Sequence, residues 1–302
     1  MRRGIRGCVG TLLLVGAGMV AAACPPTGYP PGALGALRAG GFVVADPVVR
    51  ESLALALLDC VGDPDPTLRD GLAFEGLTAW LRADALSPAT VRSLHAGLLS
   101  QLRDPYDPQG FRRPFAALLL SEVARADRVT PVLDPAGRGA MVDAVVDYLN
   151  GLRDYRGFSE REGWRHGAAH AADLVLQLVV NTTIAPADVG RMLDALATRI
   201  APTARVSWIH GEPERFARAV YFAHRRDALD DAWWDRWFDR VSSPAPLAAW
   251  GDALRSEVGL ARRHNTRAFL LSLAHLARTG GGAGDAGLLS RVDAAIARID
   301  QG

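Results

Sequence analysis

Lysine is absent from this chain of 302 residues, in which all 34 basic residues are arginine, against 33 acidic residues. The formal net charge of +1 excludes a polyelectrolyte-binding protein. The sequence also lacks a P-loop, an HExxH or CxxC motif and a G-x-S-x-G elbow, so the common nucleotide, zinc-protease, dithiol and serine-hydrolase sites are not indicated. Apolar residues make up 49%, which is enough for a sizeable core and too much for a disordered chain.

The N-terminal segment has the layout of a secretory signal. Arg2, Arg3 and Arg6 precede an apolar run over 9–20 and then three alanines. The run is shorter than the ~20 residues that a membrane-spanning helix needs. We predict that residues 1–23 are a signal peptide and that the protein is exported to the periplasm or cell envelope. The three signal arginines then account for the small basic excess.

Cysteine is scarce, with three in the chain. Cys24 directly follows the three alanines and resembles the cleavage box of a bacterial lipoprotein, which predicts lipidation of Cys24 and no membrane contact beyond that anchor. A plain secretory signal cut at the same alanines is the alternative. With Cys8 in the signal, Cys60 is the only cysteine left in the folded part, so we expect no disulfide and a buried Cys60 thiol. The Pro/Gly-rich segment 24–45 is predicted to be a tether.

Apolar residues recur with helical period almost throughout, as at Val91, Leu94, Leu98 and Leu102. No strong alternating run indicates a strand. A Trp/Phe cluster, 233–238, has the spacing of a short helix that packs into a core, with a carbohydrate platform as the alternative. The periodicity predicts five helix pairs and a closing helix: 47–60 with 67–82, 88–103 with 112–127, 136–151 with 160–180, 186–200 with 212–226, 244–257 with 264–278, and 286–299.

An arginine stands near the start of each second helix, at spacings of 44, 52, 50 and 52 residues: Arg69, Arg113, Arg165, Arg215 and Arg267. A period near 50 with two helices per unit is typical of HEAT and armadillo repeats. We therefore predict an all-α fold in which helix-pair repeats stack as a HEAT/armadillo-like α-solenoid, forming a single domain over 46–302. An irregular helical bundle is the alternative. The arginines are predicted to pair with carboxylates or to line an anion-binding groove.

The segment 154–173 concentrates polar and aromatic side chains. Ser159 and Glu162 have the spacing of a capping box, which predicts that a helix begins at about Glu160. Glycine and alanine dominate the following turns, so a neighbouring helix can approach closely.

On that helix, His166, His170 and Asp173 would stand at i, i+4 and i+7, within about 60° of one another. Two imidazoles one turn apart can reach one divalent cation, and the carboxylate can ligate it or orient an imidazole. These three residues are therefore candidate metal ligands for a divalent metal that would activate water for hydrolysis. Further ligands are suggested only by proximity in the repeat order: Asp154, His210 and Glu214.

Two other interpretations of the same residues remain open. They can form a buried network that satisfies its own hydrogen bonds, with Arg156 as the partner of Asp173. Alternatively, they form a polar ligand-binding patch to which Arg156 and Trp164 contribute.

The same segment reads D-Y-R-G-F-x-E-x-x-G-W-x-H-x-x-A-H-x-A-D from Asp154 to Asp173. This resembles the signature of a bacterial domain-of-unknown-function family, number twenty-seven eighty-five. The later segment 265–270 resembles a second recurring segment of that family. The resemblance covers about 47–277 and transfers no catalytic residue, because the family has no assigned activity. It implies that the shared centre comprises Arg156, Gly157, Trp164, His166, His170 and Asp173.

Two functions from different classes follow. The first is an exported binding or scaffold module of the bacterial cell envelope, whose groove takes an unknown peptide, protein or envelope component. Export makes nucleic acid an unsuitable partner. The second is a metal-dependent hydrolase that uses the His/His/Asp helix face.

Overall fold

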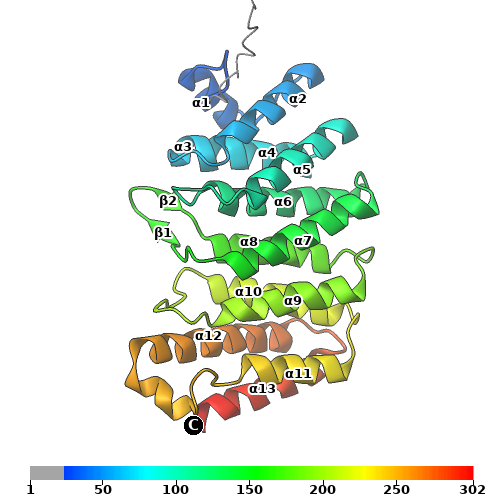
Figure 1. Cartoon of the computed structure of the whole chain (residues 1–302). Helices are drawn as coiled ribbons and strands as arrows, with labels where there is room; N and C mark the ends of the chain where they lie inside the picture. The colour runs from blue at the N-terminus through cyan, green and yellow to red at the C-terminus, as the bar shows by residue number, and fades with distance from the viewer. Residues whose placement is uncertain (1–23, 302) are drawn as a thin grey trace, which may run out of the picture.

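The computed structural model describes residues 24–301 (Figure 1), so the predicted signal peptide, 1–23, lies outside the described residues. The all-α prediction is confirmed, because the only strands in the described part are two of two residues each. Most helices form two rows in which each helix contacts the next member of its own row. The first row is α2 (Pro47–Ala56), α5 (Pro88–Arg103), α7 (Pro135–Gly151), α9 (Pro186–Ile200), α11 (Asp231–Val241) and α13 (Asp285–Asp300). The second row is α4 (Glu75–Arg82), α6 (Arg112–Val129), α8 (Gly167–Val179), α10 (Glu212–Arg225) and α12 (Glu257–Thr279).

Shorter elements connect the rows. They are α1 (Pro31–Ala39), η1 (Leu57–Cys60), α3 (Pro66–Leu68), the π-helical turn η2 (Arg69–Phe74), β1 (Phe158–Ser159), β2 (Gly163–Trp164) and the 3₁₀ turn η3 (Trp250–Arg255).

The first-row helices begin at strong sequence signals. Prolines occupy the first turn of α2, α5, α7 and α9, where a missing N–H costs nothing. Asp46, Ser87 and Asp134 accept N-cap hydrogen bonds from the first turns of α2, α5 and α7. The bounds predicted for 88–103 and 186–200 are therefore those observed.

Apolar faces of both rows form one continuous core. The tryptophan cluster belongs to it: Trp234, Trp237 and Phe238 on α11 are buried, which confirms the core interpretation over the carbohydrate platform.

One predicted helix, 244–257, is wrong. The segment is an irregular connection that contains only the 3₁₀ turn η3 before α12 begins. The Asp252 carboxylate accepts a hydrogen bond from Ala249 N at 3.2 Å, so the helical turn starts only at Trp250.

The N-terminal segment is not a tether. Cys24 forms a disulfide with Cys60, contrary to the expectation of no disulfide. Helix α1 follows it, and Leu34 and Phe42 are buried in the core. The backbone oxygen of Phe42 also accepts a hydrogen bond from Nε1 of Trp80 at 2.8 Å. Segment 24–45 is thus part of the folded domain.

The disulfide competes with the predicted lipidation of Cys24, which stays a prediction. Lipidation would join the Cys24 sulfur to a lipid through a thioether, and the same sulfur is bonded to Cys60. The two modifications exclude each other in one molecule. Within 24–301, no helix combines the length and apolar character needed to cross a membrane.

Candidate functional site

The segment 154–173 contains a β-hairpin where the sequence predicts the start of a helix. Strand β1 pairs with β2 in antiparallel register, with Ser159 opposite Gly163. The Ser159 hydroxyl does accept a hydrogen bond from the Glu162 N–H at 3.2 Å, as in a capping box, but here it closes a turn. Gly163 completes the turn with φ +73°, a conformation that favours glycine. The predicted start at about Glu160 is therefore wrong, and α8 begins at Gly167.

His166 connects the hairpin to α8 in a left-handed conformation, with φ 54°. Such a backbone is unfavourable for a residue with a side chain and persists only where its surroundings fix it. Two hydrogen bonds do so, since His166 N donates to Arg156 O at 3.1 Å and Arg165 N donates to Gly157 O at 2.8 Å. The first helical bond then joins His170 N to His166 O, which places the imidazoles one turn apart with ring centroids separated by 5.6 Å.

Two arginine side chains and one phenylalanine ring hold the hairpin against the second row of helices. The Phe111 ring lies between the guanidinium groups of Arg69 and Arg165, each 4.0 Å from its centroid. Arg69 is fully buried and donates to the carbonyl oxygen of Glu162 in the hairpin turn at 2.9 Å. Arg165 donates to the Gln109 carbonyl at 2.8 Å. Two members of the predicted arginine row thus position the site rather than bind a ligand.

The hairpin borders a cavity of about 670 Å³, which we call the histidine groove. Helices α6, α8 and α10 and the turn η2 supply most of its walls. Its polar and aromatic lining residues are Asp70, Phe74, Arg82, Phe115, Ser121, Glu122, Trp164, His166, His170, Asp173, Gln177, His210, Arg215 and Arg218.

Trp164 forms the aromatic part of the groove. Its ring stacks on His166, with centroids 4.8 Å apart and planes 29° apart, and it meets His210 edge-on at 5.9 Å. The Phe158 ring also contacts Trp164, with ring centroids 5.0 Å apart. Trp164 and Phe158 remain 38% and 46% exposed, so a ligand can reach both rings.

His166 faces a buried carboxylate that sequence analysis missed. Its Nε2 lies 3.3 Å from Oε1 of Glu212, although this contact is not aligned as a hydrogen bond. Glu212 is buried in the first turn of α10 and accepts a hydrogen bond from His210 N at 2.9 Å. Burial alone would raise the pKa of Glu212, but His166 and the backbone N–H groups outweigh it and lower that pKa. The carboxylate is therefore ionised beneath the groove.

His170 is held neutral. Burial, followed by the charges of His166 and Arg215, lowers its pKa to about 3. Its Nδ1 is buried without a hydrogen-bond partner, whereas Nε2 of His166 lies 3.3 Å from Oε1 of Glu212. Buried polar atoms are nearly always paired. The unpaired Nδ1 of His170 is an exception, and both imidazoles line the groove.

Asp173 pairs with Arg215, at 2.5 Å, and not with Arg156 as predicted. Burial raises its pKa against the opposing charge of Arg215. Arg156 instead binds Asp154 in a bidentate contact of 2.8 and 2.5 Å and does not line the groove. Position 156 acts on the site through its main chain, because the backbone carbonyl oxygen of Arg156 accepts the His166 N–H.

The predicted ligands His166, His170 and Asp173 do share one cavity. Even so, among residues 24–301 no group of three or more His, Cys, Asp or Glu side chains is arranged to hold a metal ion. Of the three further ligands suggested by proximity, His210 alone reaches the groove. Asp70 and Glu212 were missed because a π-helical turn and a neighbouring helix bring them there, and neither has a local sequence signature.

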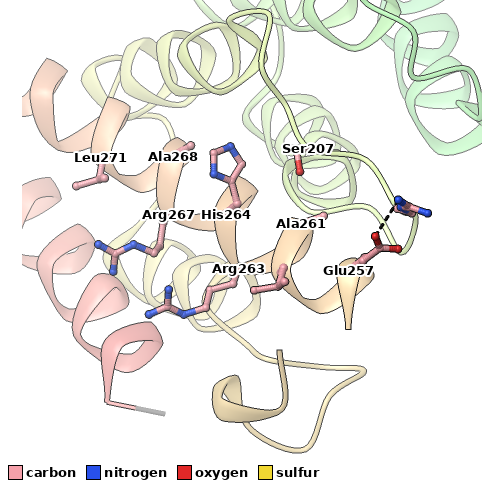
Figure 2. A pocket seen from close by; sticks show the side chains of 10 residues that line it. Ser207, Glu257, Ala261, Arg263, His264, Arg267, Ala268 and Leu271 are labelled. Atoms are coloured by element: carbon pink, nitrogen blue, oxygen red, sulfur yellow. Dashed lines mark ion pairs between the residues drawn. The ribbon is translucent and has the colours of Figure 1, made fainter. Parts of the chain in front are cut away.

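A second cavity, of about 770 Å³, lies beside α12 (Figure 2). Figure 2 shows Arg263 and Arg267 directed to the same side of α12, where both contact Asp300 of α13. The dashed line marks the Arg205–Glu257 pair, at 2.8 Å. The arginines that line this second cavity are thus already paired with carboxylates. The histidine groove is therefore the stronger candidate site.

Gly157 is required where the hairpin meets the groove. A Cβ atom at this position would lie 2.0 Å from Cδ2 of His210. We expect Gly157→Ala to displace the His210 ring and to lower the free energy of unfolding by roughly 1–3 kcal/mol, as overpacking does. Gly139→Ala on α7 is the matched control, because its Cβ meets open space and should stabilise by about 0.5–1 kcal/mol. Urea denaturation measures both, and equal effects would contradict the assignment.

The comparisons with known proteins give one match. A family model described as "Protein of unknown function (DUF2785)" matches residues 98–274, which include the hairpin, the histidine groove helices α6, α8 and α10, and most of α12. Neither the curated proteins nor the solved structures contain a match to this chain.

Proposed function

Since the chain belongs to the DUF2785 family, whose description assigns no function, we propose from its own residues that it is an exported binding protein of the bacterial cell envelope. Its ligand is a polar envelope component with a ring or planar group. The histidine groove is the binding site. The observation that carries the proposal is the groove itself, in which the accessible Trp164 ring stacks on His166 beside the neutral His170.

The groove suits recognition of a polar ligand. Trp164 offers a flat apolar surface, and such rings pack well against other rings while their edges hydrogen-bond. The walls mix acceptors and donors rather than one sign of charge, with Asp70 and Glu122 opposed by Arg82 and Arg218. A largely pre-formed cavity with a few convergent polar groups is the usual form of a small-ligand site.

Export is supported by two independent features. Residues 1–23 have the layout of a signal peptide, and the Cys24–Cys60 disulfide suits an oxidising compartment such as the periplasm. The two rows of helices, with arginines recurring about every 50 residues, support a HEAT-like solenoid as the scaffold of the groove.

Trp164 provides the test of the binding proposal. Isothermal titration with soluble peptidoglycan fragments, which carry sugar rings and peptide groups, is expected to show saturable binding. Trp164→Ala should weaken it by about tenfold, because an aromatic stacking contact contributes about 1 kcal/mol or more. Tyr106→Ala is the control, since Tyr106 is exposed and does not line the groove. Absence of binding, or equal affinity of Trp164→Ala and wild type, would reject these fragments as ligands of the groove.

The metal-dependent hydrolase is the alternative, and the observation in its favour is that His166, His170 and Asp173 line one cavity. It requires Asp173 to leave Arg215 and join His166 and His170 around a cation. Elemental analysis of the purified protein distinguishes the two functions. A stoichiometric divalent metal that is lost in His166→Ala/His170→Ala would favour the hydrolase.

A further inference from the structure

A third cavity concentrates arginine side chains without a lining carboxylate. It has a volume of about 510 Å³ and lies where α7, α9 and α11 end, next to α12. We call it the arginine pocket. Its basic lining residues are Arg153, Arg199, Arg240 and Arg262, and the arginine pocket shares no lining residue with the histidine groove.

Three of the four arginines contact no carboxylate in the described part of the chain. Arg153 and Arg199 both donate to the Leu152 carbonyl, at 2.8 and 3.0 Å, and Arg262 donates to Ala201 O at 2.8 Å. Arg240 alone has an acidic partner, Asp194. The cavity therefore carries a clear excess of positive charge.

Capping of helix ends explains only part of this arrangement. Arginines commonly donate to the last carbonyls of a helix, as Arg153 does. However, each guanidinium has five N–H donors, and Arg153, Arg199 and Arg262 make only two or three hydrogen bonds each. Nε of Arg262 is buried without a hydrogen-bond partner. Burial lowers the pKa of Arg199, and the nearby charge of Arg153 lowers it further, so a bound anion would relieve repulsion here.

We propose that the arginine pocket binds an oxyanion of the phosphate class through the guanidinium groups of Arg153, Arg199 and Arg240. Guanidinium groups match the geometry of phosphate oxygens with paired N–H donors. The protein would thereby have an anion site separate from the histidine groove. Two sources share this chemistry, a free phosphate and the headgroup of an anionic phospholipid.

Inorganic phosphate, titrated calorimetrically into the purified protein at fixed ionic strength, is expected to bind saturably. Arg153→Gln should weaken the affinity by roughly 10- to 100-fold, because charged hydrogen bonds are lost. The phosphate affinity of Arg153→Lys should lie between those of the wild type and Arg153→Gln, because lysine keeps the charge but lacks the planar guanidinium. Arg240→Gln, near the end of α11, is a second variant that leaves the backbone contacts of Arg153 and Arg199 in place. Arg263→Gln in the α12 cavity is the control and should bind phosphate as wild type does.

Vesicles of phosphatidylglycerol, compared with phosphatidylcholine, distinguish the two sources. Phosphate binding without vesicle binding supports a free phosphate. Binding to phosphatidylglycerol vesicles that phosphate displaces and Arg153→Gln weakens supports a headgroup. The proposal is overturned if neither probe binds, or if binding is unchanged in both Arg153→Gln and Arg240→Gln. Because the groove variant Trp164→Ala leaves this pocket intact, its outcome is independent of the phosphate titration.

Discussion

Loss of the Cys24–Cys60 disulfide is expected to lower the free energy of unfolding by about 2–4 kcal/mol. The bond joins residues separated by 36 positions, and closing a loop of this length removes much conformational freedom from the unfolded chain. It also holds α1 and the buried Phe42 against the core. Urea denaturation with and without a reductant measures the effect in the wild-type protein, where no side chain changes.

Two variants separate the bond from packing. Cys60 is fully buried, so Cys60→Ala also removes packed atoms, whereas Cys24 is only partly buried and Cys24→Ser perturbs the core less. Reductant should destabilise the wild type and leave Cys24→Ser unchanged. If reductant leaves wild-type stability unchanged, the disulfide does not contribute to the fold.

Mass spectrometry of the protein from the envelope decides between the disulfide and a lipid anchor. The disulfide predicts a Cys60 thiol that alkylates only after reduction. A lipidated Cys24 would leave Cys60 as a free thiol that alkylates without reductant. Because Cys60 is buried in the folded protein, the alkylation is done under denaturing conditions. A freely alkylated Cys60 would contradict the structure described here.

The sequence predicts the helices wherever local signals agree. At 88–103 and 186–200, proline at the first turn and an apolar face with helical period specify both type and ends. It fails at 160–166, because the Ser159–Glu162 pair closes a hairpin turn with the same hydrogen bond that would cap a helix. It fails at 24–45 too, where the fate of Cys24 depends on a residue far along the chain.

The candidate site was predicted in part for a similar reason. The four-residue spacing of His166 and His170 places both imidazoles on one cavity even though His166 precedes the helix, because its carbonyl accepts the first helical bond. The partners of these residues come from other helices. Glu212 and Arg215 lie on α10, and only tertiary packing reveals that they meet α8. Pairing across helices has no local pattern from which to predict it.

Acidification from pH 7 to pH 5 is expected to destabilise the protein by about 2 kcal/mol through His170 alone. Its pKa in the folded protein is about 3, while the unfolded chain has the ordinary value of 6.5. The unfolded state therefore binds a proton over this range and the folded state does not. The stability from this group is fully present above pH 6.5 and falls as the pH drops toward 3. Burial also lowers the pKa of His95 and His224, which act in the same direction.

The carboxyl groups around the site act at lower pH. The lowered pKa of Glu212 means that its contribution is present above its unfolded value of 4.5 and is lost at still lower pH. Asp173 has the opposite sign, because its raised pKa favours the protonated form in the folded state and stabilises the protein as the pH falls toward 3.8. Between pH 7 and pH 5, the change in the free energy of unfolding therefore comes mainly from the histidines and not from these carboxyl groups.

His170→Gln removes the titration while keeping a polar side chain of similar length. Between pH 7 and pH 5, we expect the free energy of unfolding of the variant to fall by about 2 kcal/mol less than that of the wild type. Urea denaturation at each pH measures this difference. His275→Gln is the matched control, because His275 is exposed on α12 and its replacement should leave the pH dependence unchanged. If both variants retain the wild-type slope, His170 is not held neutral at the base of the groove. A neutral His170 has one ring nitrogen that donates a hydrogen bond and one that accepts.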